Sequence, residues 1–238
     1  MRLNKFLSSI GFCSRRQADK YIESGKIYID SAVATLGTEL ENKQKVYFEK
    51  KYIGQIEDLD SKKRVVLAVN KPRGIVCTSS DKDRAQNIVD FINYPLRIYP
   101  VGRLDKDSEG LLLMTNDGSL VNAIMKAKNH HEKEYIVEVN KKIDEIFLKN
   151  MASGVYIEEL KVKTRKCRTG KIAEKSFRII LTQGLNRQIR RMCETLGFRV
   201  LSLKRVRIVN ITLGKLKTGE YRKLSKTELD ALDSLIGE

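Results

Sequence analysis

From residue 65 onward the chain is a succession of short apolar segments, most of them closed by Asn, Asp or Gly. Such segments, rich in Val, Ile, Leu, Tyr and Phe, are typical of β-strands. Helical patterns lie between some of them without regular strand–helix alternation, which favours an α+β domain around a mixed, largely antiparallel sheet with flanking helices. The predicted strands are 65–70, 75–78, 98–101, 111–115, 135–139, 177–181 and 201–211, and the predicted helices are 88–92, 120–126, 143–151, 187–196 and 226–235.

The first 48 residues have a different pattern, which predicts a separate small module. Apolar residues recur at helical spacing from Leu3 to Ile10, and Ser14 begins a second helix that ends near Gly25. Short strands follow. Residues 49–64 mix charges of both signs without a sustained period, which indicates a linker. The predicted organisation is a module over 1–48, a linker over 49–64 and a second domain over 65–238.

Positive charge is concentrated in one quarter of the chain. Residues 161–223 contain 19 Lys and Arg against three acidic residues, whereas the rest of the chain has 27 of each sign. The cations are interleaved with apolar residues, so they belong to folded elements that present a positive face. Such a face attracts a polyanion, and nucleic acid is the expected partner, with affinity that falls as salt rises. A cationic surface that serves only solubility is the alternative.

Several classes of protein are disfavoured by what the sequence lacks. Its longest aliphatic runs are far shorter than the ~20 residues of a membrane-spanning helix, and its N-terminus makes a poor signal peptide. The four cysteines lie far apart, and His130 and His131 are the only histidines, so neither a zinc site nor a disulfide framework is expected. We expect a cytoplasmic protein with free thiols and no metal, in which any chemistry rests on Asp, Glu, Lys, Arg or Tyr.

Residues 102–110 read G-R-L-D-K-D-S-E-G and superficially resemble a calcium loop. The twelfth position, where such a loop needs a bidentate Glu, is Asn116, and an apolar strand follows directly, so calcium is rejected. What remains is Asp105, flanked by Arg103 and Lys106, cations that would keep its carboxylate ionised. An ionised, positioned Asp can act as a nucleophile. The residues alone also allow an Asp that merely caps a turn.

Two further segments carry candidate residues. Arg187, Arg190 and Arg191 lie in the first turns of a predicted helix after Gly184, an arrangement that suits an anion site or a solvated helix face. Tyr135 opens a predicted strand. A strand tyrosine usually belongs to the core or the sheet surface, although near a nucleic-acid face it can stack on an unpaired base.

Taken together, these segments resemble the pseudouridine synthases of the RsuA/RluB/RluE/RluF family, and details are most similar to its F-type members. The matching motifs are N-K-P-R-G-I-V at 70–76, G-R-L-D-K-D-S-E-G-L-L-L-M-T-N-D-G at 102–118, H-E-K-E-Y at 131–135 and G-L-N-R-Q-I-R-R-M at 184–192. The first module resembles the S4 RNA-binding domain through R-L-N-K-F-L, G-x-C-S-R-R-Q-A-D and I-x-x-G-K-I-Y-I-D.

The resemblance implies that Asp105 is the catalytic aspartate, which attacks either C1′ of the ribose or C6 of the uracil. It implies that Tyr135 stacks on the base and assists proton removal from C5, that Arg190 pairs with the aspartate, and that Ile189 packs beside the ring. No cofactor is required for such an isomerisation. A paired uridine cannot reach a carboxylate in a cleft, so the target must be everted.

The basic residues are then expected to hold the RNA. Near the pocket these are Arg103, Arg187 and Arg191, and on the S4-like module they are Arg15, Arg16 and Lys20. The expected substrate is a uridine of 23S ribosomal RNA, bound by a monomer that takes neither DNA nor membrane as a partner. The alternatives are the same chemistry on tRNA or 16S RNA, and a noncatalytic ribosome-associated RNA-binding protein.

Overall fold

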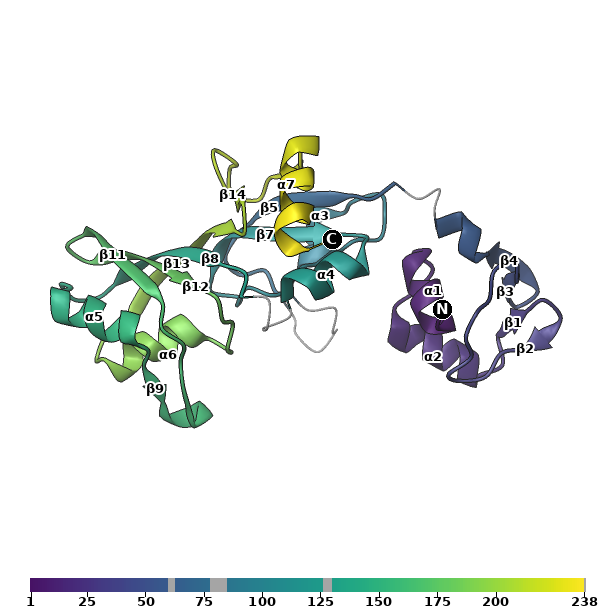
Figure 1. Ribbon diagram of the computed structural model, residues 1–238, viewed down its shortest axis with the longest axis horizontal. Coiled ribbons are helices and arrows are strands. Elements are labelled where there is room, and N and C mark those ends of the chain that lie inside the picture. Colours follow the sequence, from purple (N-terminus) through teal and green to yellow (C-terminus); the bar gives the residue numbers. More distant parts are fainter. Residues whose placement is uncertain (60–62, 78–84, 126–129, 238) are drawn as a thin grey trace. The chain divides into compact units, whose positions relative to one another are not determined.

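The computed structural model describes residues 1–59, 63–77, 85–125 and 130–237. The chain divides into two compact units (Figure 1). The first holds residues 1–65 with the short segments 95–97 and 116–118, and the second holds the remainder.

The first unit packs two helices on a small sheet with strand order β2-β1-β3-β4. Its second helix begins where predicted, because the Ser14 hydroxyl accepts a hydrogen bond from the Gln17 amide at 3.1 Å. Leu3, Phe6 and Leu7 form the centre of its core. The elements are α1 (Leu3–Ser9), α2 (Arg15–Glu23), β1 (Ile27–Ile29), β2 (Ala32–Val33), β3 (Val46–Phe48), β4 (Lys51–Gly54) and the 3₁₀-helix η1 (Ile56–Leu59).

Residues 51–59, expected to lie in a linker, are part of this first unit. β4 pairs antiparallel with β3, and Ile53, Ile56 and Leu59 pack against the core. A four-residue strand and a single 3₁₀ turn are too short to leave a sustained hydrophobic period, which is why the segment looks featureless in the sequence.

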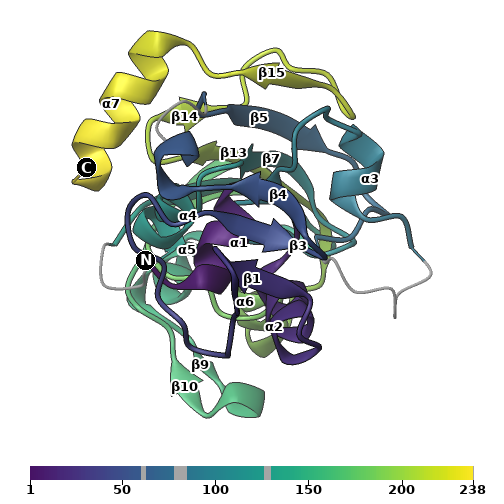
Figure 2. The ribbon, with the colours of Figure 1, turned by 90° about the vertical axis from the view of Figure 1, so that its right-hand side faces the viewer.

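The second unit is built on one large mixed sheet with the order β11-β12-β8-β13-β7-β5-β15, in which β14 pairs with β13 and β6 with β7. Every pair is antiparallel except β7 with β13. In Figure 2, β15 and β5 lie at the top with β7 and β13 beneath them. The strands are β5 (Val66–Lys71), β6 (Tyr99–Pro100), β7 (Glu109–Thr115), β8 (Lys133–Val139), β11 (Arg168–Ala173), β12 (Ser176–Leu181), β13 (Val200–Ile208), β14 (Ile211–Thr212) and β15 (Tyr221–Lys223).

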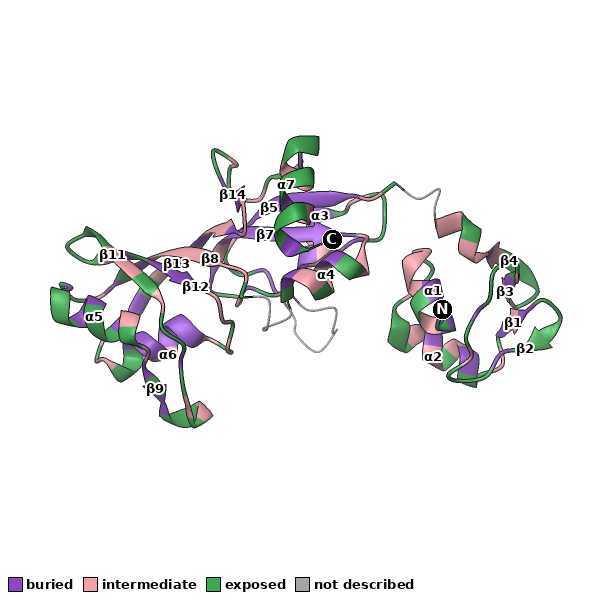
Figure 3. Ribbon diagram, in the orientation of Figure 1, coloured by how far each residue is buried: buried purple, intermediate pink, exposed green. Residues whose placement is uncertain are grey.

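Two hydrophobic cores flank the parallel β7–β13 pair. Helices α5 (Glu145–Ser153) and α6 (Gln188–Thr195) contribute Phe147 and Met192 to a core with β8, β12 and β13. Helices α4 (Gly118–Met125) and α7 (Lys226–Ile236) contribute Leu120 and Leu232 to a second core with β5 and β7, strands that Figure 3 shows as buried along nearly their whole length. The α+β fold with a largely antiparallel sheet is confirmed.

The remaining elements are short. They are α3 (Ile88–Ile92), the hairpin of β9 (Tyr156–Ile157) and β10 (Val162–Lys163), and the 3₁₀-helix η3 (Glu158–Leu160) between those two strands. The predicted strand 201–211 is interrupted, because Val209 adopts a φ of 51° and turns the chain between β13 and β14. In the predicted strand 75–78, Val76 forms an isolated bridge with Asn87, and residue 78 lies outside the described residues. Within the described residues no helix is long and apolar enough to cross a membrane.

Candidate active site

A pocket of about 600 Å³ in the second unit brings together several of the predicted site residues. Its walls come from the loop before β7, from β8 and β13, and from the segment that leads into α6. Asp105, Tyr135 and Ile189 line it, as do Arg103 and Arg187. The volume lies in the usual range for small-ligand sites.

Asp105 lies in the loop between β6 and β7, and buried cations hold this loop from behind. Lys71, fully buried at the end of β5, donates to the carbonyl oxygens of Pro72 at 2.8 Å and Ser108 at 2.9 Å. The Ser108 amide in turn donates to the Asp105 carbonyl at 3.0 Å. These bonds fix the backbone that carries the Asp105 carboxylate. The N-K-P motif contains Lys71, but the sequence alone did not predict its hydrogen bonds to this loop.

Arg190 lies behind the same loop and does not line the pocket. Its side chain is 7% exposed and donates to the carbonyl of Asp107 at 3.1 Å and the hydroxyl of Ser108 at 3.4 Å. Among the described residues, no ion pair within 4.0 Å joins Arg190 or any other cation to the Asp105 carboxylate. Burial lowers the pKa of Arg190, the charge of Arg187 lowers it further, and Asp105 opposes both. Arg190 therefore acts on Asp105 through the loop backbone and at longer range.

Gly110 allows β7, the strand that follows the Asp105 loop, to pack closely against β13. At a φ of 105°, a conformation that favours glycine, it pairs with Arg205 where β7 meets β13. A Cβ at this position would lie 2.7 Å from the Arg205 amide nitrogen and closer still to its carbonyl oxygen. Only glycine permits this approach of the two strands, which sets the loop before β7 beside the pocket face of β13.

Tyr135 and Ile189 form apolar walls of the pocket. Tyr135 lies opposite Arg205 in the β8–β13 register and packs against the core that contains Val137. Ile189, 4% exposed, lies in the first turn of α6. An aromatic ring and an aliphatic side chain in one pocket suit a flat, partly apolar ligand such as a nucleobase.

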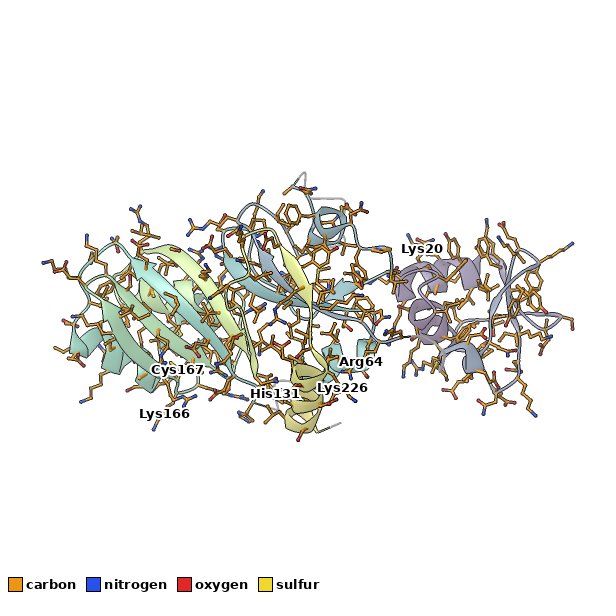
Figure 4. The ribbon with its side chains drawn as sticks, turned by 90° about the horizontal axis from the view of Figure 1, so that it is seen from above. Lys20, Arg64, His131, Lys166, Cys167 and Lys226 are labelled. Carbon is orange, nitrogen blue, oxygen red and sulfur yellow. The ribbon has the colours of Figure 1, made fainter. Side chains whose placement is uncertain are left out.

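The predicted RNA-binding residues lie in three settings. Arg103 is exposed at the pocket, and Arg187 lines it while its guanidinium lies 3.7 Å from the Asp107 carboxylate. Arg191 does not line the pocket, because it turns away and pairs with Glu159 at 3.1 Å. On α2 of the first unit, Arg15, Arg16 and Lys20, the last labelled in Figure 4, are exposed.

Sequence reasoning missed three further basic residues in the pocket wall: Lys133, Arg205 and His131, the last labelled in Figure 4. Lys133 is part of H-E-K-E-Y, and Arg205 lies in the basic run of β13, but the sequence alone assigned neither residue a function. Strand alternation places Lys133 on the same face as Tyr135, which is the signal that identifies it.

Comparison with known proteins agrees with this architecture. The profile of the RNA pseudouridylate synthase family matches residues 65–195, and that of the S4 domain matches residues 1–45. The chain belongs to the RNA pseudouridylate synthase family and carries an S4 domain at its N-terminal end. It is a pseudouridine synthase, as the resemblance in the sequence implied.

Individual relatives sharpen the assignment. The chain is 49% identical to the dual-specificity RNA pseudouridine synthase RluF of Escherichia coli K12, over 99% of this chain and 79% of that protein. It is 32% identical to the ribosomal large subunit pseudouridine synthase B of Bacillus subtilis, over 98% of this chain and 96% of that protein. A crystal structure of a pseudouridylate synthase, 29% identical, superposes with a TM-score of 0.71 over 98% of this chain and 99% of that chain. The expected similarity to the F-type members is confirmed.

Proposed function

We propose that Asp105 is the nucleophile with which this pseudouridine synthase isomerises a uridine of 23S ribosomal RNA. The observation that carries the proposal is the shared pocket, in which Asp105 is the only acid among the described lining residues and Tyr135 supplies an aromatic surface. The names of the two relatives, a dual-specificity RNA enzyme and a ribosomal large subunit enzyme, support ribosomal RNA as the substrate.

The geometry suits a nucleotide that leaves its helix to react. An everted uridine stacks on Tyr135 with Ile189 at its side, at a cost of a few kcal/mol that stacking and backbone contacts offset. The Asp105 carboxylate then adds to C1′ or C6, and the N1–C1′ bond breaks. The base turns and C5 bonds to C1′, the C5 proton leaves while N1 takes up a proton, and the carboxylate is released. Substrate and product are isomers, so no group is gained or lost.

The cations outside the chemistry are assigned to the RNA backbone. Arg103 and Arg187 at the pocket are placed to contact phosphates near the everted nucleotide. Arg15, Arg16 and Lys20 on the S4 domain contact RNA outside the pocket. Because all the described pocket residues come from one unit of one chain, we expect a monomer to be active. We also expect activity without a cofactor and a location in the cytoplasm.

Replacement of Asp105 tests the chemical assignment. The Asp105→Asn variant should bind its RNA within about threefold of the wild-type Kd and lose at least ~10⁴-fold in single-turnover rate, as expected when a nucleophile is removed. Asp107→Asn is the matched control, because it removes the same charge two residues away, from a side chain outside the pocket. Pseudouridine formed by Asp105→Asn at the wild-type rate would refute the assignment.

The choice of RNA needs a separate experiment. Pseudouridines should be mapped in 23S, 16S and transfer RNA from cells with and without this protein. We expect a site in 23S RNA to lose its modification. A loss confined to tRNA or 16S RNA would keep the chemistry and change the substrate, and no loss in any RNA would favour the noncatalytic RNA-binding alternative.

A further inference from the structure

The pocket contains cations for which the proposed chemistry has no use. Lys133 and Arg205 lie on the pocket face of β8 and β13. Arg205 is opposite Tyr135 on the neighbouring strand, and Lys133 is two residues before Tyr135 on the same strand. Side chains opposite each other across such strands lie about 5 Å apart. Arg205 is therefore a direct neighbour of the ring on which the base is expected to stack, and Lys133 lies two residues along the same strand face and lines the same pocket.

Arg205 is the more deeply buried of the two, with 3% of its surface exposed. Its Nε donates to the Leu111 carbonyl at 2.7 Å, a bond that ties β13 to β7. Its Nη2 is buried and has no hydrogen-bond partner in the described part of the chain. Since an unpaired buried donor is costly, this donor calls for a partner that the described residues do not supply.

Lys133 is also poorly satisfied. The only hydrogen bond of its ammonium group among the described residues goes to the His131 carbonyl at a long 3.4 Å, and an ammonium group has three donors. Burial lowers the pKa of Lys133, and the charge of Arg205 lowers it further. The two positive charges therefore act on each other across a pocket whose single described acid is Asp105.

The acids nearest in sequence do not neutralise this pair. Glu134 faces the reverse side of β8, where it pairs with Arg207 at 2.8 Å, and Glu132 pairs with Arg207 at 3.0 Å and with Arg168 at 2.6 Å. The pocket face is left with a net positive charge beside Tyr135.

The reaction supplies a matching negative charge on the base. If Asp105 displaces the base at C1′, the electron pair of the N1–C1′ bond leaves on N1 and spreads to O2 and O4. If Asp105 adds to C6, the electron pair of the C5–C6 double bond moves toward O4. Both routes place negative charge on carbonyl oxygens of the ring.

We propose that Lys133 and Arg205 form a cationic subsite that binds a carbonyl oxygen of the everted uracil and stabilises the negative charge that the ring gains during the reaction. This inference rests on the function proposed for Asp105. Fixed donors aimed at developing charge in a water-poor pocket lower the barrier without reorganisation. The hydrogen bond from Nε of Arg205 to the Leu111 carbonyl is structural. The subsite uses the other donors of the guanidinium group, including Nη2.

Single-turnover kinetics on the RNA that contains the mapped uridine test the subsite. Lys133→Gln and Arg205→Gln should each lower the rate of the chemical step by about 100-fold, the effect of losing one such donor, while Kd for the RNA changes less than about threefold. Lys204→Gln removes the same charge from a neighbouring residue of β13 outside the pocket and should keep the wild-type rate. Thermal unfolding checks that each variant folds. If Arg205→Gln does not fold, Lys133→Gln alone tests the subsite.

A substituted base separates catalysis from a merely structural role. Sulfur accepts hydrogen bonds weakly, so RNA with 2-thiouridine or 4-thiouridine at the target should react more slowly with the wild-type enzyme. If Lys133 or Arg205 contacts that position, the thio substitution should have little further effect in its Gln variant, a non-additivity that a structural residue does not produce.

The outcomes distinguish this inference from the function on which it rests. Wild-type rates in both Gln variants, additive effects with both thiouridines, or a loss confined to RNA affinity would overturn the subsite while leaving Asp105 in place. Absence of product with the wild-type enzyme on every RNA would instead remove the proposed function.

Discussion

Both faces of the β8–β13 strand pair carry basic residues, but the two faces differ in what these residues bind. On the reverse face, Arg207 donates to both Glu132 and Glu134. On the pocket face, Lys133 and Arg205 have donors for which the described residues supply no partner. One face uses its charges to hold strands together, and the other keeps them available for a ligand, at some cost in stability.

A β-bulge makes this separation possible. Arg205 and Arg207 are two residues apart, and regular alternation would place them on one face. The register of β13 against β8 shifts between these two residues, so Arg207 lies opposite Glu134 on the reverse face while Arg205 stays opposite Tyr135. A local irregularity in one strand thus divides a basic run into a structural arginine and a pocket arginine.

The largest effect is expected from breaking the contact that brings the pocket face against β7. Gly110→Ala places a methyl group against the Arg205 backbone and should lower the free energy of unfolding by about 3 kcal/mol or more, since neither backbone can yield cheaply. Gly214→Ala is the matched control, because Gly214 also has a positive φ, of 56°, but its added Cβ meets nothing within 4 Å. Urea unfolding of both variants measures the difference, and equal losses would show that the β7–β13 approach is not tight.

A smaller effect is expected on the reverse face. Arg207→Gln leaves Glu132 and Glu134 without their shared partner and should lower the free energy of unfolding by about 1.5 kcal/mol, as for hydrogen bonds to charged groups. Pseudouridine formation by the folded variant should stay within a few-fold of the wild-type rate. A large loss of activity without a loss of stability would contradict the division between the two faces.

The smallest and opposite effect is expected on the pocket face. Lys133→Met should raise the free energy of unfolding at neutral pH by about 1 kcal/mol, because it removes a half-buried charge, while it lowers activity. Burial lowers the pKa of Lys133 in the folded state, so the unfolded chain binds more protons, and wild-type stability rises with pH toward the unfolded value of about 10.4. The advantage of Lys133→Met should therefore shrink as pH rises through this window. An advantage that does not change with pH would show that Lys133 carries no such burial cost.

Much of the framework was predictable from the sequence. Apolar periodicity located α3 to α7 and the central strands within a few residues, and strong turn residues marked their ends. The strands β9, β10, β11 and β15 were missed because they are short or largely exposed, so that packing against a neighbour and not hydrophobic pattern determines them.

The site was only partly predictable, for a different reason. The resemblance to the family pointed to Asp105, Tyr135 and Ile189, which do share a pocket. Spacing along a helix did not separate Arg190, which grips the loop behind the pocket, from Arg191, which pairs with Glu159. The pocket position of Arg205 depends on strand register and on a bulge, which are not visible without the partner strand, whereas alternation along β8 could have identified Lys133.

The parallel pairing of β7 with β13 also determines when the pocket exists. The bond from Arg205 to Leu111 joins residues 94 positions apart in the chain. Long-range contacts of this kind are slow to close during folding, since they carry the greatest loop entropy. Because the Asp105 loop and Arg205 both line the pocket, a nascent chain has no complete pocket until β13 has been synthesised and has paired with β7.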